Sequence, residues 1–174
     1  MMECIFESEK MIHSFIPENF PAPLVWGSYK SIPNMHFYIC AFVEMTDDLP
    51  DGAKFAAVLA SLHNNSMGKS PKGMYVLPLT THLAFIPNDN SWASTWTEWF
   101  SNAMSRMFEE EERFHGVNDE LNVLKAALFD TGGNSIQPSL CHSDVWPGNM
   151  KPDIDTDEVM FFDSCAFWGH HECE

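Results

Sequence analysis

The chain has 174 residues, of which 25 are acidic and 9 basic, so its formal net charge at pH 7 is -16. A surface this acidic repels the phosphates of nucleic acids and of anionic membranes, and we expect neither as a partner. The hydrophobic content of 45% and the 14 phenylalanines suffice for the core of one globular domain, or of one domain and a small part of another.

Cysteine usage and apolar segments indicate a cytoplasmic protein. The five cysteines are an odd number and lack the spacing of a disulfide framework. The N-terminus shows no charged region followed by an apolar run, as a secretion signal would. The longest apolar runs, such as 37–43, are too short to cross a bilayer. We therefore expect a reducing, cytoplasmic setting and no membrane.

The N-terminal part of the chain is expected to form a helix, two strands and a second helix. Apolar residues at helical spacing ahead of Pro17 predict the first helix. Two stretches rich in β-branched and aromatic residues predict a strand hairpin. The expected bounds are 7–15 for the first helix, 24–29 and 36–43 for the strands, and 53–63 for the second helix.

From residue 64 onward, the sequence predicts helices followed by a small pair of strands. Residues 64–90 mix Gly, Pro, Ser and Asn, which indicates a long and mostly irregular segment. An apolar stripe predicts a helix whose aromatic residues belong to a core. The expected bounds are 92–114 for this helix, 121–129 for a helix ending at Gly132-Gly133, 139–141 and 159–162 for strands, and 153–158 for a turn. The order predicts an α+β fold with two lobes.

One segment carries a pattern typical of phosphoryl-transfer enzymes. Asp144 follows His142 by two residues and precedes Asn149 by five. In kinase catalytic loops this layout lets the aspartate accept a hydrogen bond from the substrate hydroxyl while the asparagine ligates magnesium. A hydrophobic strand then leads to Asp163, where such folds place a second metal-binding carboxylate. We expect His142 to brace the loop through backbone hydrogen bonds.

These residues resemble a known family. The resemblance lies in Pro138-Ser139-Leu140, in the run from His142 to Asn149, in Asp153 to Glu158, in Phe162-Asp163 and in Gly169 to Glu172, with weaker matches in Phe6-Glu7-Ser8, Ile12-His13 and Trp26 to Tyr29. Together they are similar to the fructosamine/ketosamine kinases. The resemblance implies a protein-kinase-like fold, with an N-lobe remnant over 1–46 and a partial C-lobe over 47–174.

The resemblance also implies an activity and its residues. Members use ATP and Mg²⁺ to phosphorylate the sugar 3-hydroxyl of ketosamines, which are glycated proteins or small ketosamines, as a step of deglycation. By position, Asp144 would be the catalytic residue, and Asn149 and Asp163 would hold the metal. The hinge that meets adenine through backbone groups would be Phe42, Val43, Glu44 and Met45.

Three departures from the family pattern lead us to expect an incomplete member, truncated in the N-lobe and at the C-terminus, with its activity in doubt. No glycine-rich loop or strand lysine precedes the first helix. The glutamate that pairs with that lysine is expected just before Phe6, where Cys4-Ile5 stands, leaving Glu3 or Glu7 as substitutes. Ser143 replaces a glycine, which adds a side chain to a tight loop.

Two other functions remain open at the level of the sequence. One is a phosphotransferase of the aminoglycoside or choline kinase type, whose loops have similar spacing. The other is an inactive pseudokinase remnant that binds a partner through its acidic surface and exposed aromatic residues.

The histidines and cysteines near the end of the chain raise the question of zinc. Cys165, His170, His171 and Cys173 could hold zinc if they converged with Cys141 or His142. Their spacing matches no common structural zinc site, so we interpret them as buried or incidental residues.

Overall fold

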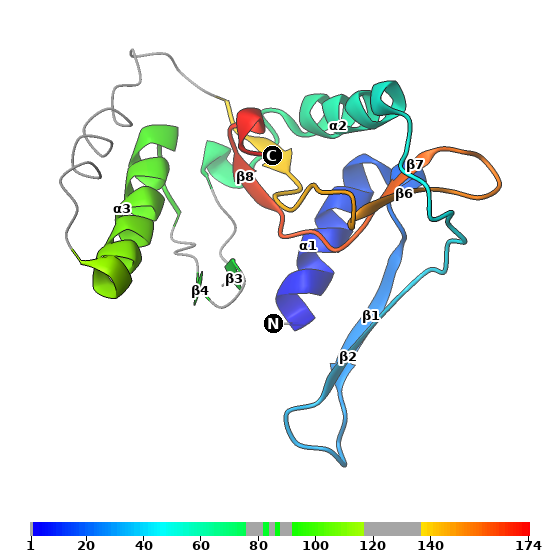
Figure 1. Ribbon diagram of the computed structural model, residues 1–174, viewed down its shortest axis with the longest axis horizontal. Coiled ribbons are helices and arrows are strands. Elements are labelled where there is room, and N and C mark those ends of the chain that lie inside the picture. Colours follow the sequence, from blue (N-terminus) through cyan, green and yellow to red (C-terminus); the bar gives the residue numbers. More distant parts are fainter. Residues whose placement is uncertain (1, 76–81, 84–85, 88–91, 117–136) are drawn as a thin grey trace.

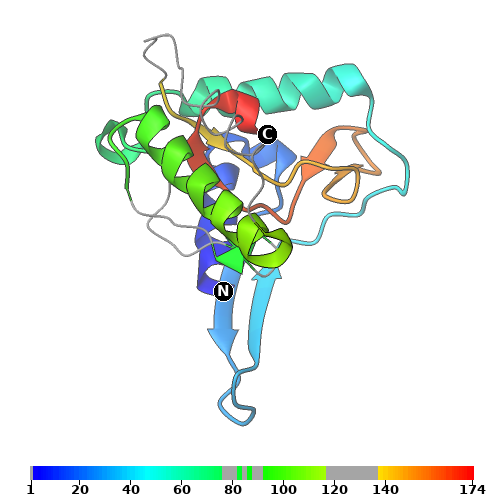
Figure 2. The same cartoon turned by 60° about the vertical axis from the view of Figure 1, so that its left-hand side comes forward.

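The computed structural model describes residues 2–75, 82–83, 86–87, 92–116 and 137–174. Helices pack against short pairs of antiparallel strands, and one pair projects from the body as a hairpin (Figures 1 and 2). The fold is α+β, as predicted. Within the described residues, no helix combines the length and the apolar character that spanning a bilayer requires.

The first helix, α1 (Met2–Phe15), begins five residues earlier than expected and ends where predicted, just before η1 (Pro17–Asn19). Its buried side is formed by Ser8, Glu9 and Ile12. Ile12 follows Ser8 by four positions and Glu9 by three, which is the spacing of one helix face. Two polar side chains therefore point into the protein from this helix.

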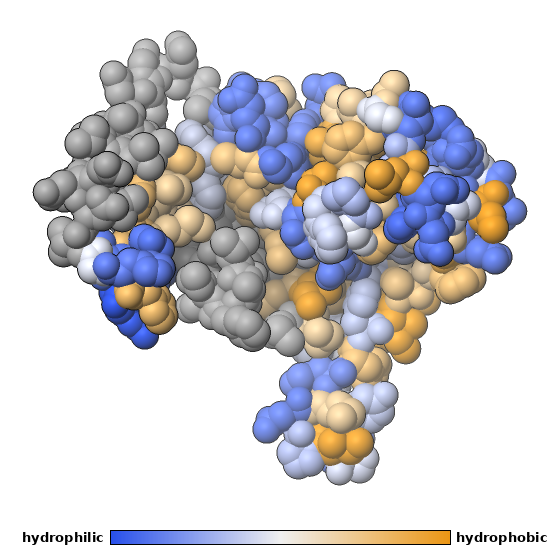
Figure 3. Space-filling model, in the orientation of Figure 1, coloured by the Kyte–Doolittle hydropathy of each residue, from blue (hydrophilic) through white to orange (hydrophobic). Residues whose placement is uncertain are grey.

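The predicted hairpin consists of β1 (Pro23–Ser28) and β2 (His36–Cys40), which are antiparallel with Trp26 opposite Tyr38. β2 ends three residues before the expected Val43, because the chain leaves the sheet there and Met45 forms an isolated bridge elsewhere. The hairpin and the connection between its strands expose apolar side chains: Leu24, Val25, Tyr29, Ile32, Met35 and Ile39. Figure 3 shows hydrophobic surface on the face of the hairpin turned to the viewer.

The second helix, α2 (Gly52–Ser66), confirms the prediction and extends it by one residue at the start and three at the end. Asp51 caps its N-terminus by accepting hydrogen bonds from the backbone N–H groups of Ala53 and Lys54. Within the predicted irregular region lie η2 (Pro71–Gly73), β3 (His82–Leu83) and β4 (Ile86–Pro87). Residues 76–81, 84–85 and 88–91 lie outside the described part.

The aromatic stripe forms α3 (Trp96–His115), which begins at the N-cap Thr95. Trp96 and Trp99 pack on a small cluster built around Tyr75 and Ala93, so the stripe is core, as predicted. The helix expected over 121–129 lies outside the described residues.

The C-terminal region contains four short strands where the sequence predicted two. They are β5 (Ser139–Cys141), β6 (Met150–Pro152), β7 (Val159–Phe161) and β8 (Phe167–Gly169), followed by η3 (His171–Cys173). β5 pairs with β8, and β6 pairs with β7. The predicted turn 153–158 joins β6 to β7. The strands that the sequence missed are three residues long, too short to show a period of two.

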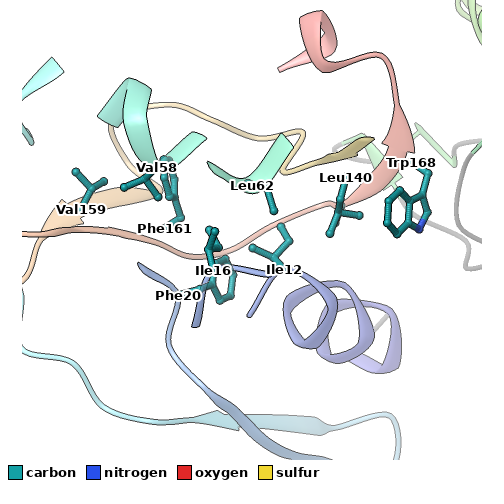
Figure 4. Close-up of a cluster of buried hydrophobic side chains, with 10 residues drawn as sticks. Ile12, Ile16, Phe20, Val58, Leu62, Leu140, Val159, Phe161 and Trp168 are labelled. Atoms are coloured by element: carbon teal, nitrogen blue, oxygen red, sulfur yellow. The ribbon is translucent and has the colours of Figure 1, made fainter. Parts of the chain in front are cut away.

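One hydrophobic core joins the ends of the chain (Figure 4). It contains Ile12, Ile16, Phe20, Val58, Leu62, Leu140, Val159, Phe161, Ala166 and Trp168. α1 and α2 meet β5, β7 and β8 in this cluster, and the predicted catalytic residues lie in the segments between these strands. The division into lobes at residue 46 stays a prediction.

Candidate active site

Asn149 links the loop after β5 to the end of the β6–β7 hairpin. Its buried amide donates hydrogen bonds from Nδ2 to Asp144 Oδ2 at 2.8 Å and to the Asp144 carbonyl at 3.0 Å. The same nitrogen lies 3.4 Å from the carbonyl oxygen of Asp163. One side chain therefore brings together the backbones of the two segments that carry the predicted carboxylates.

The two carboxylates are open to solvent while the linking amide is not. Asp144 and Asp163 are exposed, and Asn149 is buried. Because Nδ2 makes the contacts to the loop, no hydrogen bond in the described part of the chain uses Asn149 Oδ1. An amide oxygen and a carboxylate are the kinds of ligand that Mg²⁺ prefers, so this donor set fits that ion.

His142 braces the loop through backbone contacts, as predicted. Its imidazole Nε2 lies 3.1 Å from the Phe162 carbonyl, and the Asp144 N–H lies 3.4 Å from Nδ1. Burial lowers the pKa of His142, which favours the neutral ring. A neutral ring protonated on Nε2 satisfies both contacts, because Nε2 then donates and Nδ1 accepts.

The turn between His142 and Asp144 depends on Ser143 and on Glu174. Ser143 has a φ of 70°, in the left-handed region that glycine adopts most easily, so the added side chain does strain this loop. Glu174 accepts hydrogen bonds from the Ser143 N–H at 3.0 Å and from the His142 N–H at 2.8 Å. It also pairs with His63 Nε2 at 2.9 Å.

These contacts fix the ionisation of Glu174. Burial opposes its charged form, but the hydrogen bonds from His63, Ser143 and His142 outweigh this effect, and the pKa of the carboxyl lies below its ordinary value. The backbone of residue 174 is exposed, whereas its side chain retains only 10% of its accessible surface. No local pattern in the sequence identifies Glu174, because the residues that it contacts precede it by 31 or more positions.

Helix α1 holds the segment that contains Asp163. Ser8 Oγ accepts a hydrogen bond from the Ala166 N–H at 2.8 Å and lies 2.9 Å from Ser164 Oγ. Next to it, the buried Glu9 carboxylate accepts a hydrogen bond from the Tyr38 hydroxyl and faces backbone N–H groups of Asp163 and Ser164. Burial raises the pKa of Glu9, and these hydrogen bonds lower it in part.

Glu9, and neither Glu3 nor Glu7, is therefore the helix carboxylate beside the predicted metal ligand. Glu3 is exposed, and Glu7 lies 3.9 Å from Lys10 on the outer side of the helix. Of the helix glutamates, the geometry therefore favours Glu9 over Glu3 and Glu7, the two that the sequence left open, and the pairing with a lysine stays a prediction. A signal was available in the sequence, since Ser8 and Glu9 precede the buried Ile12 by four and three residues.

The predicted hinge runs from β2 toward the β6–β7 turn. The Glu44 carbonyl accepts a hydrogen bond from the Ile154 N–H at 2.9 Å, and Met45 bridges to Asp153. Among the described residues, no backbone hydrogen bond involves Phe42 or Val43. The Phe42 side chain is 88% exposed. The first half of the hinge thus offers unpaired backbone groups, and the second half is anchored.

The residues considered for zinc do not converge as a set. Cys165, His170, His171 and Cys173 do not bring their ligand atoms into one group with Cys141 or His142 in the described part of the chain. Cys141 instead lies with His63 and Glu174.

The fold is that of the protein-kinase-like class. The crystal structure of "Putative fructosamine-3-kinase" from Haemophilus somnus 129PT matches 97% of this chain with a TM-score of 0.70 at 21% sequence identity. A structure of the same name from Thermobifida fusca YX-ER1 matches the same share with a TM-score of 0.70 at 19% identity. The fructosamine kinase family model matches residues 4–174, and the chain belongs to this family. The resemblance found in the sequence is confirmed.

The names of two curated relatives agree with this assignment. "Protein-ribulosamine 3-kinase, chloroplastic" of Oryza sativa subsp. indica is 24% identical over 155 residues, which are 79% of this chain and 41% of the relative. The protein of the same name from Arabidopsis thaliana is 24% identical over 160 residues, which are 82% of this chain and 47% of the relative. The chain spans less than half the length of these relatives and 57% of each of the two solved structures.

Proposed function

We propose that this chain carries the catalytic loop and metal-binding segment of an ATP- and Mg²⁺-dependent kinase that phosphorylates the sugar 3-hydroxyl of ketosamines. The observation that carries the proposal is the Asn149 amide, which contacts the Asp144 carboxylate and the Asp163 carbonyl at once. The names of the relatives support ketosamines as the substrate class, either on glycated proteins or as small molecules.

In this proposal Asp144 acts on the acceptor. Its exposed carboxylate accepts the hydrogen bond of the sugar hydroxyl, orients the oxygen and takes the proton as the new O–P bond forms. Asn149 keeps that carboxylate in place through the bond to Oδ2. A carboxylate is a weak base, but phosphoryl transfer depends mainly on positioning and charge neutralisation.

Asn149 Oδ1 and the Asp163 carboxylate would hold Mg²⁺. When bound, ATP would supply the phosphoryl group as its bond to ADP breaks, and the ion would neutralise the developing charge. A chain with a net charge of -16 repels a bare triphosphate, so we expect nucleotide binding to require the divalent cation. Glu9 fills the place of the helix glutamate that pairs with a strand lysine in such kinases. Its burial beside the Asp163 segment supports this assignment.

For the adenine we propose the hinge of Phe42, Val43, Glu44 and Met45. The backbone groups of Phe42 and Val43 have no hydrogen-bond partner among the described residues, so they are available to a base. A reducing compartment such as the cytoplasm fits the five cysteines, which are all free.

The test is phosphate transfer from ATP to fructosyl-lysine and ribulosyl-lysine peptides, followed by mass spectrometry. Transfer measured with the unaltered chain should fall by about 100-fold or more in Asp144→Asn. Asp155→Asn, in the exposed β6–β7 turn, is the matched control and should retain activity.

Two further measurements separate the alternatives. Transfer to choline or aminoglycosides but not to ketosamines would identify the other phosphotransferase type. Calorimetry with ATP and Mg²⁺ distinguishes the pseudokinase, since a remnant that does not hold nucleotide should show little heat. A chain that neither binds Mg²⁺-ATP nor transfers phosphate would contradict the proposed function.

A further inference from the structure

Three side chains of different types converge outside the candidate active site. They are His63 on α2, Cys141 at the end of β5 and Glu174 after η3. One ligand atom from each, the imidazole nitrogen, the thiol sulfur and a carboxylate oxygen, lies within 4.8 Å of the other two. The three come from segments far apart in the sequence, so their meeting is a product of the fold.

The surrounding packing keeps these residues together. Leu62 and Leu140, the neighbours of His63 and Cys141, lie in the core, where α2 packs on β5 (Figure 4). The Leu140 N–H also donates a hydrogen bond to Ser66 Oγ at 2.8 Å, which links the two elements directly. The backbone positions that carry the histidine and the cysteine are therefore fixed before any ion binds.

The donor atoms are available to an ion. Among the described residues the Cys141 sulfur lies 3.4 Å from the His170 carbonyl and 3.9 Å from the Ser139 carbonyl, as a thiol donor, and it also faces the backbone of Gly169. Once the thiol loses its proton, its sulfur has lone pairs to offer an ion. The Glu174 carboxylate offers about four acceptor positions, and the described contacts use three of them. The side chains of His63 and Glu174 keep 12% and 10% of their surface exposed, which leaves a path from solvent.

We propose that His63, Cys141 and Glu174 form a binding site for a zinc ion. Imidazole nitrogen, thiolate sulfur and carboxylate oxygen are the three ligand types that zinc takes in proteins. The ion takes the place of the hydrogen bond between His63 Nε2 and Glu174, with the neutral imidazole carrying its proton on Nδ1, and a water from the exposed side completes four ligands. The two backbone N–H groups bound to Glu174 are unaffected, so zinc and the catalytic loop share this carboxylate.

Binding is coupled to protons. Burial, and then the neighbouring Glu174 and Cys173, raise the pKa of the Cys141 thiol, so the site without metal keeps it protonated. Coordination turns it into a thiolate and releases that proton. Zinc affinity should therefore rise with pH. A calorimetric titration in buffers of different ionisation enthalpy measures the released proton directly.

The first experiment uses chain purified without a histidine tag, dialysed against a metal-free buffer after loading with Zn²⁺. We expect about one zinc per chain by mass spectrometry of the metal. Loading with Co²⁺ instead should produce the thiolate-to-cobalt charge-transfer absorption. A loaded chain that retains no zinc, or a cobalt form without this band, overturns the proposal without reference to any variant.

Variants then identify the ligands. Cys141→Ser and His63→Ala should each weaken zinc binding by about 100-fold or more. Loss of a residue that only hydrogen-bonds to a metal ligand already lowers metal affinity about 10–100-fold, and loss of a ligand itself should cost at least as much. Cys4→Ser on α1, a half-buried cysteine remote from the cluster in sequence, is the matched control and should bind as the parent does. Circular dichroism checks that each variant folds. Equal zinc binding by folded Cys141→Ser would also overturn the assignment.

Discussion

The carboxylate of Glu174 accepts a hydrogen bond from the backbone N–H of Ser143 at 3.0 Å, and thereby holds the one residue of the candidate catalytic turn that has a left-handed φ. The same carboxylate accepts the N–H of His142. A strained turn persists only when its surroundings hold it in place, and here a charged acceptor does so. The geometry of Asp144 therefore depends on a residue that touches neither Asp144 nor Asn149.

Glu174→Gln should lower the free energy of unfolding by about 1–3 kcal/mol at pH 7. The amide has one oxygen to offer, so at least one of the three donors around it loses its acceptor. Urea unfolding with EDTA present measures the change free of any metal effect. Glu172→Gln is the control, because its side chain is 79% exposed. Equal losses in both variants would contradict the role of Glu174.

The contribution of Glu174 should disappear in acid. Its pKa in the folded chain lies below the ordinary value of 4.5, so the folded state favours the carboxylate more than the unfolded state does. The stabilisation is present above pH 4.5 and is lost as the pH falls through the folded pKa. The unfolding free energies of the parent chain and Glu174→Gln, followed by urea titration at decreasing pH, should converge. A constant difference down to pH 3 would argue against this linkage.

Ser8→Ala should destabilise the chain by about 1–3 kcal/mol, because it leaves the N–H of the buried Ala166 without its acceptor. Ser14→Ala on the same helix is a matched control, since its exposed hydroxyl bonds only to the Met11 carbonyl. Thermal or urea unfolding of both variants gives the comparison. If Ser8→Ala and Ser14→Ala lower the stability of the chain equally, Ser8 does not hold the Asp163 segment.

Ser143→Gly should stabilise the folded chain by up to about 1 kcal/mol. A residue with a Cβ costs about 1–2 kcal/mol in the left-handed conformation of position 143, and glycine avoids this cost. Glycine also raises the conformational entropy of the unfolded chain, which offsets part of the gain in stability. Ser143→Ala keeps the Cβ and should give no such gain. Chemical denaturation of the two variants side by side tests this, and a more stable alanine variant would show that the strain is not at this residue.

Several features could be read from the sequence because their signals are local. The helix stop before Pro17 and the spacing of Asp144 and Asn149 are properties of neighbouring residues. The loop pattern identified the family, and the predicted position of His142 as a brace is confirmed by its contacts. The roles of Asp144, Asn149, Asp163 and the hinge stay predictions.

Other features have no local signal. β8 is three residues long and exists because the distant strand β5 supplies its hydrogen-bond partners. β6 is equally short and pairs with β7 across the predicted turn, but three residues show no strand period of their own. Helical periodicity could have placed Glu9 on the buried side of α1, but not beside Asp163, 154 positions later in the printed sequence. The sequence around Glu174 predicts a solvated glutamate, and only the folded structure places its carboxylate at the N–H groups of His142 and Ser143.

The sequence by itself determined the family and the α+β class, and it predicted the polar residues of a catalytic loop, since these depend on residue type and spacing along the chain. The tertiary structure decided which distant side chains hold the two segments of the site: Glu174 holds the loop that carries Asp144, and Ser8 and Glu9 from α1 hold the segment that carries Asp163. The physical reason is that a buried backbone N–H must find an acceptor, and only the packed core determines which distant side chain comes close enough to provide one.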